Sequence, residues 1–258
     1  MSTMIAASEA PQLRMQGRVA TLTLSRPGHA NRLTPEDLGQ LQRHIAAVNA
    51  DDRVLVLRIV AEGKYFCSGY DISSLADADA PGSLYFGETV DIIEQARPVT
   101  IAAVQGGVYG GGTDLCLACD FRIGTQQANM FMPATRLGLH FYPGGLQRYV
   151  SRLGLDASKR LFLTAEKLDA QEMLRIGFLT ELVEAADLDT RVDALTAVLV
   201  DMAPLALIGV KKHLNLIARG VLQADEIKAS VLISEKSHDI AEGARAWKEK
   251  RQPRFTGT

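Results

Sequence analysis

The pattern of apolar and polar positions predicts several strands in the first half of the chain. Residues 19–25 alternate between apolar and polar, which is typical of a half-buried strand. Residues 54–60 and 99–104 are short apolar runs rich in branched side chains, and they predict fully buried strands. Shorter strands are expected at 120–124 and 129–132.

Helical periodicity appears between these segments. Thr34 precedes Pro35 and two acidic residues, a pattern typical of a helix that begins with Thr34 as its N-cap. The helix is expected to run to about Asn49, because apolar residues recur at helical spacing at Leu38, Leu41, Ile45 and Val48. Further helices are expected over 84–96 and 111–119. Residues 77–82 read as a mobile surface segment.

The last third of the chain is predicted to be largely helical. One helix face is marked by Leu188, Val192, Leu195 and Leu199. A second helix begins at Pro204 and runs to about Arg219, and two more cover roughly 222–238 and 240–250. Strands interleaved with helices, followed by helices alone, predict an α/β fold with parallel pairing and a helical C-terminal extension. We expect a core of residues 1–200 and a helical region of residues 201–258.

Composition and charge are those of an ordinary globular protein. The chain has 258 residues, of which 47% are apolar and 22% charged, and its net charge is −2. A nucleic-acid surface normally needs a basic face, and no run approaches the roughly 18 apolar residues of a membrane span. Residues 1–16 lack the basic and apolar regions of a secretion signal. We expect a cytoplasmic protein with neither a nucleic-acid nor a membrane partner.

The three cysteines, Cys67, Cys116 and Cys119, fit a reducing compartment. Cys116 and Cys119 have the spacing of a metal or redox pair, but they lie within an apolar helical run. The histidines offer no second ligand pair at zinc spacing. We therefore expect these cysteines in the core and no metal site, with a redox or metal role as the less favoured alternative.

Two glycine-bearing loops are the main candidates for chemistry. Residues 66–71 and 106–114 each follow a predicted buried strand and place glycine just before an expected helix. Such loops expose backbone N–H groups to negative charge, and glycine leaves no Cβ in the way. One N–H group from each loop can converge on one oxygen as an oxyanion hole. Tight strand-to-helix turns are the equally favoured alternative. The loops lack the Gly-Lys-Ser/Thr of a Walker A motif and the leading Gly-x-Gly of a dinucleotide site.

Ordered motifs along nearly the whole chain are those of a known family. They are Ser25-Arg-Pro with Asn31-Arg-Leu33, Phe66-Cys-Ser-Gly-Tyr-Asp-Ile72, Pro98-Val-Thr-Ile-Ala-Ala-Val104 with Gly110-Gly-Gly-Thr-Asp-Leu115, Cys119-Asp120, Pro143-Gly-Gly-Leu-Gln-Arg148, Leu163-Thr-Ala-Glu-Lys-Leu-Asp-Ala170 and Glu249-Lys-Arg-Gln-Pro-Arg-Phe255. In these motifs the chain resembles the enoyl-CoA hydratase/isomerase (crotonase) family.

The resemblance implies an α/β spiral of ββα units with a helical C-terminal trimerisation region, and so a homotrimer or a dimer of trimers. It implies an acyl-CoA thioester of fatty acid metabolism as substrate, with no separate cofactor because coenzyme A is part of that substrate. By matched position, the N–H groups of Tyr70 and Gly111 would hold the thioester oxygen. Ser68 would lie along the adenine, and Gly69 and Gly110 would belong to the same binding loops.

The chain departs from the family pattern at the acid–base positions. Family hydratases carry two glutamates; the first falls on Asp114, one methylene shorter, and the second on Ala134. Hydration requires water to be activated at one carbon and a proton to be supplied at the other, and paired carboxylates do both. Alanine can do neither, so ordinary hydratase activity is not expected.

Several alternatives follow from this loss. Asp114 can act alone as the surviving acid/base and move one proton between two carbons, which is isomerase chemistry and our first hypothesis. Tyr142 or His140 can take over as acid or base. The protein can also bind acyl-CoA without turnover, or act as a thioester hydrolase or decarboxylase through Asp114 or Tyr142.

A non-catalytic interpretation accompanies each of these residues. Asp114 can favour the helix dipole, His140 reads as a loop residue, and Tyr142 can merely line the acyl pocket, which residues 72–87 are expected to shape. Core positions are expected for Met130, Phe131 and Met132. A charged run near the end of the chain can meet the CoA phosphates or stay solvated, namely Lys248, Lys250 and Arg251.

Overall fold

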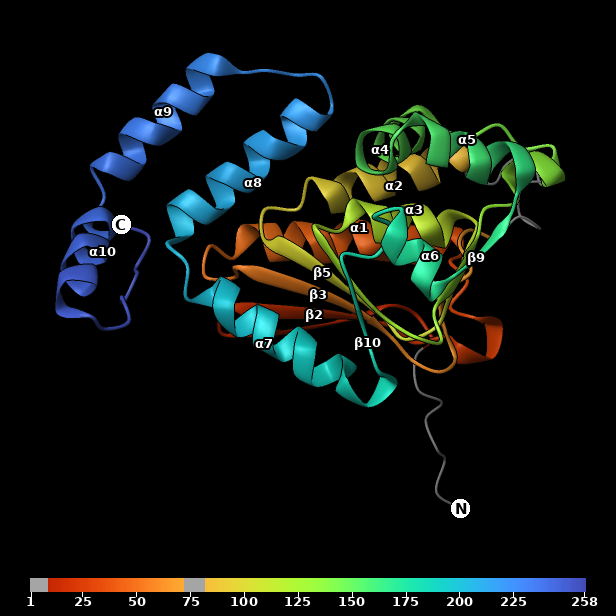
Figure 1. Ribbon diagram of the computed structural model, residues 1–258, viewed down its shortest axis with the longest axis horizontal. Helices are drawn as coiled ribbons and strands as arrows, with labels where there is room; N and C mark the ends of the chain where they lie inside the picture. The colour runs from red at the N-terminus through yellow and green to blue at the C-terminus, as the bar shows by residue number, and fades with distance from the viewer. Residues whose placement is uncertain (1–8, 72–81) are drawn as a thin grey trace.

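The computed structural model describes residues 9–71 and 82–258, so most of the segment expected to be mobile and to shape the pocket lies outside the described residues. Six strands form the larger sheet, in the order β1-β2-β3-β5-β7-β10 (Figure 1). They are β1 (Gln12–Gln16), β2 (Val19–Leu24), β3 (Val56–Ala61), β5 (Val99–Val104), β7 (Phe121–Thr125) and β10 (Glu181–Val183). Only β1 is antiparallel to its neighbour in this sheet; the other pairs are parallel, as predicted.

A smaller sheet lies beside the first and is built from three-residue strands. These are β4 (Tyr65–Cys67), β6 (Gly107–Tyr109), β8 (Asn129–Phe131) and β9 (Lys167–Asp169). The chain passes from the larger sheet to the smaller one and then into a helix, as in β5-β6-α3. This repeated ββα unit is the predicted one. β1, β4, β6, β9 and β10 were not predicted, because segments this short or this polar carry no clear period-two signal.

The helices of the core are α1 (Pro35–Ala50), α2 (Ser83–Glu94), α3 (Gly111–Ala118), α4 (Pro143–Leu153), α5 (Leu155–Thr164) and α6 (Ala170–Arg175). Among them α1 begins where the capping pattern predicts, α2 and α3 begin within one residue of their expected starts, and α4, α5 and α6 were not predicted individually. At the start of α1, the Asp37 N–H donates to the Thr34 hydroxyl at 3.3 Å, and the Thr34 N–H donates to the Asp37 carboxylate at 2.9 Å. This reciprocal capping box satisfies two amides that have no acceptor within the helix.

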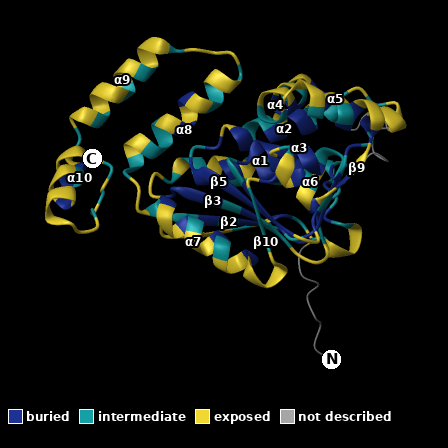
Figure 2. Ribbon diagram, viewed as in Figure 1, coloured by how far each residue is buried: buried dark blue, intermediate teal, exposed yellow. Residues whose placement is uncertain are grey.

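The C-terminal part of the chain is helical, as predicted. It contains α7 (Leu188–Val200), α8 (Pro204–Ala218), α9 (Ala224–Glu235) and α10 (His238–Glu249). Figure 1 shows α9 and α10 reaching away from the sheets, and Figure 2 shows them largely exposed. The division between residues 200 and 201 falls in the α7–α8 connection and stays a prediction. In the described ranges no single helix is long and apolar enough to cross a membrane; α7 with η4 (Ala185–Asp187) and α8 pass that test only as a pair bent by 109°.

The core lies between the sheets and the helices that cover them. All six residues of β5 are buried, as an unbroken apolar run predicts. Cys67, Cys116 and Cys119 are each 0% exposed, so their predicted place in the core is confirmed. Burial raises the pKa of Cys67 and of Cys119 to about 12, and that of Cys116 well above its ordinary value. These thiols are therefore protonated near neutral pH.

Candidate active site

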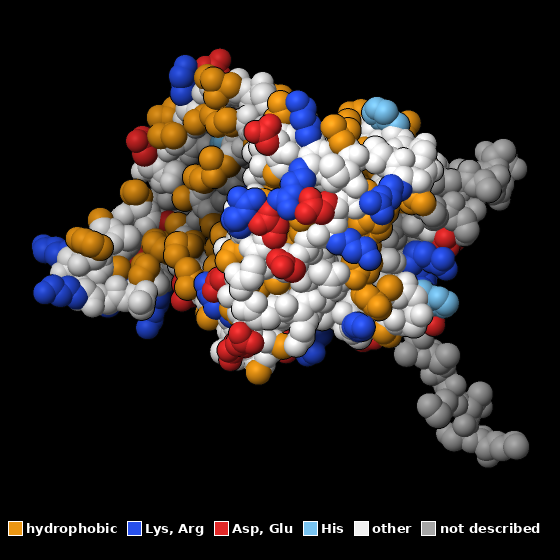
Figure 3. All heavy atoms as spheres, turned by 45° about the vertical axis from the view of Figure 1, so that its right-hand side comes forward, with side chains coloured by type: hydrophobic (Ala, Val, Ile, Leu, Met, Phe, Trp, Pro, Cys, Tyr) orange, Lys and Arg blue, Asp and Glu red, His pale blue; other side chains and the backbone are white. Residues whose placement is uncertain are grey.

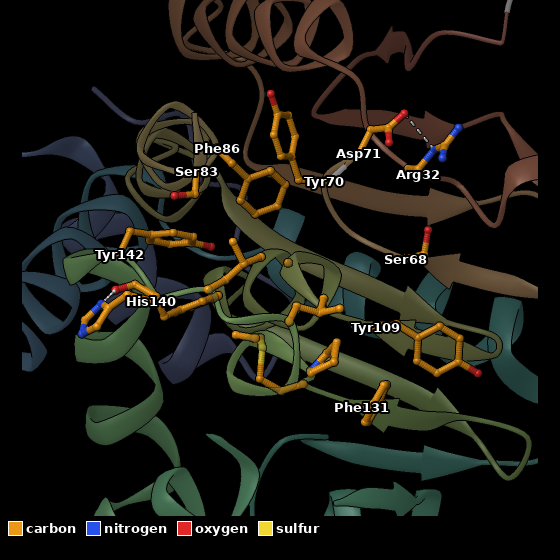
Figure 4. A pocket seen from close by; sticks show the side chains of 18 residues that line it. Arg32, Ser68, Tyr70, Asp71, Ser83, Phe86, Tyr109, Phe131, His140 and Tyr142 are labelled. Carbon is orange, nitrogen blue, oxygen red and sulfur yellow. Dashed lines mark hydrogen bonds and ion pairs between the residues drawn. The ribbon is translucent and has the colours of Figure 1, made fainter. Parts of the chain in front are cut away.

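An apolar cavity of about 340 Å³ opens beside the smaller sheet. Its walls come from the loop after β4, the start of α2, the β6–α3 turn, the end of β8 and the loop before α4. Figure 4 shows Tyr142 and His140 on one side of this space, with Ser68 and Tyr109 on the other. Walls of this kind, with a few polar groups, are typical of small-molecule sites.

The structure brings the two glycine loops into contact at this cavity. Gly69 has a φ of +87°, and a Cβ built on it would lie 2.5 Å from the backbone nitrogen of Gly111. A Cβ on Gly112 would lie 2.4 Å from the carbonyl oxygen of Cys67. Only glycine permits this approach of one backbone to the other. Ser68, Tyr70, Gly110 and Gly111 all line the same cavity.

Backbone pairing sets the direction of the Tyr70 amide. The Leu33 N–H donates to the Gly69 carbonyl and the Asp71 N–H donates to the Leu33 carbonyl, both at 2.9 Å, around a parallel bridge between Leu33 and Tyr70. The Tyr70 N–H therefore points away from Leu33, toward the side on which β6 pairs with β4. The Gly111 N–H is the first amide of α3 and has no acceptor within the helix. Tyr70 and Gly111 both line the cavity.

Asp114 is buried in the protein and does not reach the cavity. It is 0% exposed and is not among the cavity-lining residues. The Arg148 guanidinium donates to both carboxylate oxygens, from Nε to Oδ1 at 3.0 Å and from Nη2 to Oδ2 at 2.7 Å. The Tyr142 hydroxyl donates to Oδ2 at 2.6 Å. Tyr142 thus separates Asp114 from the cavity, and an acid–base role for Asp114 stays a prediction.

Tyr142 forms the end wall of the cavity and is itself only 5% exposed. Its ring stacks on Phe141 with 4.2 Å between ring centroids and lies 6.0 Å from the ring of Phe86. Burial, and then the charge of Asp114, raises the pKa of Tyr142 well above its ordinary value. The phenol is therefore neutral across the physiological range and donates its proton to Asp114.

Arg148 is the residue of this cluster that sequence reasoning missed. It comes from α4, and its Nη1 donates to Asp91 at 2.6 Å and to Glu94 at 3.0 Å, both from α2. Burial alone would lower the pKa of Arg148, but the charge of Asp114 raises it above its ordinary value on balance. The sequence did carry a signal for Arg148, because Gly145, Arg148 and Tyr149 recur at the spacing of one helix face. In the structure that face is buried.

The remaining predicted residues occupy different positions. His140 lines the cavity as an exposed loop residue, with Nδ1 2.7 Å from the carbonyl oxygen of Phe141. Ala134 also lines the cavity, so no carboxylate arises at that position. The core positions predicted for Met130 and Met132 are confirmed, with 0% and 1% exposure, although Met132 also contributes to the cavity wall. Phe131 was expected in the core, but it is only half-buried and lines the cavity, because the end of β8 forms one edge of that space.

Charged side chains lie both at the cavity and at the end of α10. At the cavity, Arg32 and Asp71 form an ion pair of 3.3 Å that sequence reasoning did not anticipate. Arg251 pairs with Glu242 and Glu249 at the end of α10, and neither it nor Lys248 or Lys250 lines the cavity of its own protomer. Within residues 9–71 and 82–258, no three His, Cys, Asp or Glu side chains are grouped so that they could hold a metal ion.

The family model for enoyl-CoA hydratase/isomerase matches residues 14–258, which is nearly the whole chain. The chain belongs to the enoyl-CoA hydratase/isomerase family. A short-chain-enoyl-CoA hydratase from Clostridium acetobutylicum is 31% identical over 254 residues, covering 93% of this chain and 95% of the relative. A carnitinyl-CoA dehydratase from Salmonella enteritidis is 31% identical over 263 residues, covering 97% and 99%.

Solved structures of this family share the fold. An enoyl-CoA hydratase from Bacillus anthracis superposes with a TM-score of 0.84 at 26% identity, covering 96% of this chain and 99% of that one. An enoyl-CoA hydratase/carnithine racemase from Magnetospirillum magneticum gives a TM-score of 0.91 at 24% identity, covering 98% and 97%, and this likeness concerns the fold alone. The predicted family and fold class are confirmed, whereas trimerisation stays a prediction.

Proposed function

We propose that this member of the enoyl-CoA hydratase/isomerase family binds an acyl-CoA thioester and stabilises its enolate, and that it isomerises the acyl group rather than hydrating it. The observation that carries the proposal is the convergence of the Gly69–Tyr70 and Gly110–Gly111 loops on a cavity that ends in Tyr142, whose hydroxyl donates to Asp114 behind it. Relatives named as hydratases and dehydratases of CoA thioesters support the substrate class. Coenzyme A is part of this substrate, and we propose no separate cofactor.

The backbone end of the cavity would hold the thioester carbonyl oxygen. Removing a proton from the carbon next to the carbonyl moves negative charge onto that oxygen. Fixed N–H donors from Tyr70 and Gly111 would stabilise this charge, and each such donor contributes on the order of 3–4 kcal/mol. Ser68, at the wall of the same cavity, would lie beside the CoA moiety.

The opposite end would accept and return the proton. In this step the Tyr142 oxygen takes a proton from the acyl carbon while the Tyr142 hydroxyl proton passes to Asp114 across their 2.6 Å contact. The reverse movement returns a proton to a different carbon, which completes an isomerisation without net loss of atoms. Asp114 thus keeps its expected role as the surviving acid/base, but acts through Tyr142 rather than on the substrate directly.

Exchange of acyl hydrogens tests this function directly. Butyryl-CoA incubated with the enzyme in D₂O should incorporate deuterium next to the carbonyl, measured by NMR, and 3-enoyl-CoA should convert to 2-enoyl-CoA. Hydration of crotonyl-CoA should stay near the uncatalysed rate. Tyr142→Phe should slow exchange by about 100-fold or more, since a general base contributes about 10²–10⁴, and Asp114→Asn should also slow it. Tyr65→Phe, away from the cavity wall, is the matched control. Rapid crotonyl-CoA hydration by the wild type would contradict the proposal.

A second candidate is an acyl-CoA-binding protein without turnover. It is favoured by the engagement of both Asp114 oxygens, which leaves Asp71, paired with Arg32, as the sole carboxylate lining the cavity in the described part of the chain. Tight acyl-CoA binding with no deuterium exchange and no product would favour this candidate. Mass analysis would reveal free CoA or lost carbon dioxide if the protein were a thioester hydrolase or decarboxylase.

We also propose a homotrimer or a dimer of trimers formed through the C-terminal helices. Figure 3 shows hydrophobic side chains gathered over this part of the molecule. In this part of the chain Leu214 is 60% exposed, Leu222 70% and Trp247 87%. Light scattering coupled to gel filtration should give three or six times the protomer mass, and a monomeric mass would contradict this assembly. A cytoplasmic location remains part of this proposal.

A further inference from the structure

Arg148 does not line the cavity, but two of its nitrogens contact Asp114, which together with Tyr142 forms the proposed proton-accepting pair. Its Nε and Nη2 donate to the two oxygens of Asp114 at 3.0 and 2.7 Å. A guanidinium carries donors only, so both oxygens of Asp114 act as acceptors. Arg148 therefore holds Asp114 as a carboxylate anion at a position that is 0% exposed, where an isolated charge would be strongly disfavoured.

An outer layer of charges holds Arg148 in turn. Its Nη1 donates to Asp91 and to Glu94. Arg219, at the end of α8, contacts the same two carboxylates, at 2.9 Å from Asp91 and 2.7 Å from Glu94. The Arg148 side chain is 1% exposed and all three of its nitrogens donate to carboxylates, so its orientation is fixed from both sides.

The ring of Tyr142 is held equally firmly. A Cβ on Gly87 would lie 2.5 Å from this ring, and a Cβ on Gly145 would lie 2.7 Å from it. Phe141 stacks on the ring with 4.2 Å between centroids. Figure 4 shows the hydroxyl at the inner end of the ring, toward the middle of the cavity. The Tyr142 oxygen therefore keeps its place beside Asp114.

Resting on the proposed function, we propose that Arg148 is a positioning residue that sets the direction of the Tyr142 hydrogen bond and thereby the choice of acyl group. The single hydroxyl proton of Tyr142 is donated to Asp114, so the Tyr142 oxygen offers the cavity only lone pairs. The end wall favours an acyl group that brings a hydrogen-bond donor, such as a hydroxyl, and disfavours one that brings only an acceptor.

The direction of the Tyr142 hydrogen bond depends on Arg148, because it depends on whether Asp114 is ionised. A neutral Asp114 would carry a proton of its own and could donate it to Tyr142. The Tyr142 hydroxyl would then be able to donate toward the ligand, and the preference for donors would disappear. Arg148 disfavours this state in the resting site, because its charge and its paired donors stabilise an ionised Asp114, which takes up a proton only during the proposed proton transfer.

Matched thioesters test the preference by isothermal titration calorimetry. They are butyryl-CoA and its hydroxy and methoxy derivatives at C3 and at C4, of which the methoxy compounds keep the oxygen but lose the donor. At one of these carbons the hydroxy compound should bind the wild type about fivefold more tightly than butyryl-CoA, the effect of roughly 1 kcal/mol for one net hydrogen bond. The methoxy compound should bind less tightly than butyryl-CoA. Tyr142→Phe should abolish both differences.

Two variants separate positioning from a merely structural role. Arg148→Lys keeps a charged donor and should retain the ratio of hydroxy to methoxy affinity, whereas Arg148→Gln should lose it. Thermal denaturation checks that each variant is folded; if Arg148→Gln is not, loss of the ratio in Arg148→Lys would overturn the role of Arg148, and the wild type with Tyr142→Phe still decides the donor preference. Equal affinities for hydroxy and methoxy compounds in the wild type, or an unchanged ratio in Tyr142→Phe, would overturn it. Binding of every thioester without discrimination overturns this inference alone, whereas failure of all of them to bind overturns the proposed function too.

Discussion

The two ends of the cavity are made from different parts of the polypeptide. At the end proposed to hold the thioester oxygen, the polar groups are backbone amides of Tyr70 and Gly111, placed by glycines. At the other end they are side chains, with Tyr142 backed by Asp114 and Arg148. The first arrangement depends on the path of the main chain, the second on which side chains pack together. A scaffold can therefore keep one step of a reaction while the residues of the other step change.

The two ends also differ in how they respond to substitution. The backbone end contains almost no spare volume, because added Cβ atoms at Gly69 or Gly112 would overlap neighbouring main-chain atoms. Behind the side-chain end lies a cluster of charged groups in which each arginine is paired with carboxylates and each carboxylate with an arginine. We expect substitutions at the first end to act by steric overlap and those at the second by loss of charge balance. Four measurements test this difference.

The largest expected effect is on stability, from Arg148→Met. This change leaves Asp114 buried without its cation, and breaking a buried ion pair in this way costs about 3–5 kcal/mol. Urea denaturation should show that loss as a lower free energy of unfolding. The control is Arg53→Met, which removes a pair with Asp51 on a side chain that is 80% exposed and should change stability little. Similar losses in both variants would contradict a special role for the buried cluster.

At the backbone end, Gly69→Ala should lower deuterium exchange into acyl-CoA by at least about 100-fold, the usual effect of losing one oxyanion donor. The added Cβ would meet the Gly111 nitrogen at 2.5 Å. Gly17→Ala is the matched control, because Gly17 also has a positive φ, +59°, but nothing lies within 4 Å of the added Cβ. If both variants lost activity equally, backbone strain rather than steric overlap would be the cause.

A carboxylate placed at the side-chain end should restore part of the missing chemistry. Ala134 lines the cavity, so Ala134→Glu introduces an acid–base group there. We expect crotonyl-CoA hydration to rise by at least about tenfold, less than the 10²–10⁴ of an optimised group. Ala134→Gln has nearly the same shape and should show no gain. A hydration rate that stayed the same in both would indicate that Asp114, held behind Tyr142, cannot supply the second function.

The smallest effect near neutral pH concerns two buried thiols, Cys67 beside the Gly69 amide and Cys119 at the far end of α3. Cys67 accepts a hydrogen bond from the Gly69 N–H at 3.3 Å, and burial raises the pKa of Cys67 and Cys119 from 9.0 to about 12. Unfolded thiols ionise at the lower pH, so stability is complete below about pH 9 and falls as the pH rises toward 12. The fall is about 1.4 kcal/mol per pH unit for each thiol. Denaturation curves between pH 8 and pH 11 measure it, and Cys119→Ala should make the slope shallower. A slope that did not change would show that Cys119 ionises in the folded state.

Much of the fold could be predicted because its signals are local. The Thr34 capping box, the apolar run of β5 and the helix face of α7 each reside within a short stretch of chain. In the smaller sheet β8 was predicted but β4, β6 and β9 were not, since β4 and β6 form by pairing with each other rather than by their own periodicity. The site divides similarly: the glycine loops were found, but Arg148 was not.

From the sequence alone came two glycine loops as candidate amide donors, and an alanine at position 134, a side chain that cannot transfer a proton. Tertiary structure alone decided that Asp114 faces Arg148 and Tyr142 instead of the cavity. The reason is physical: these contacts join residues 28 and 34 positions apart, brought together by the packing of α3 against α4. A buried carboxylate turns toward the cation that offsets its desolvation, and where that cation lies is a property of the packed helices rather than of either segment alone.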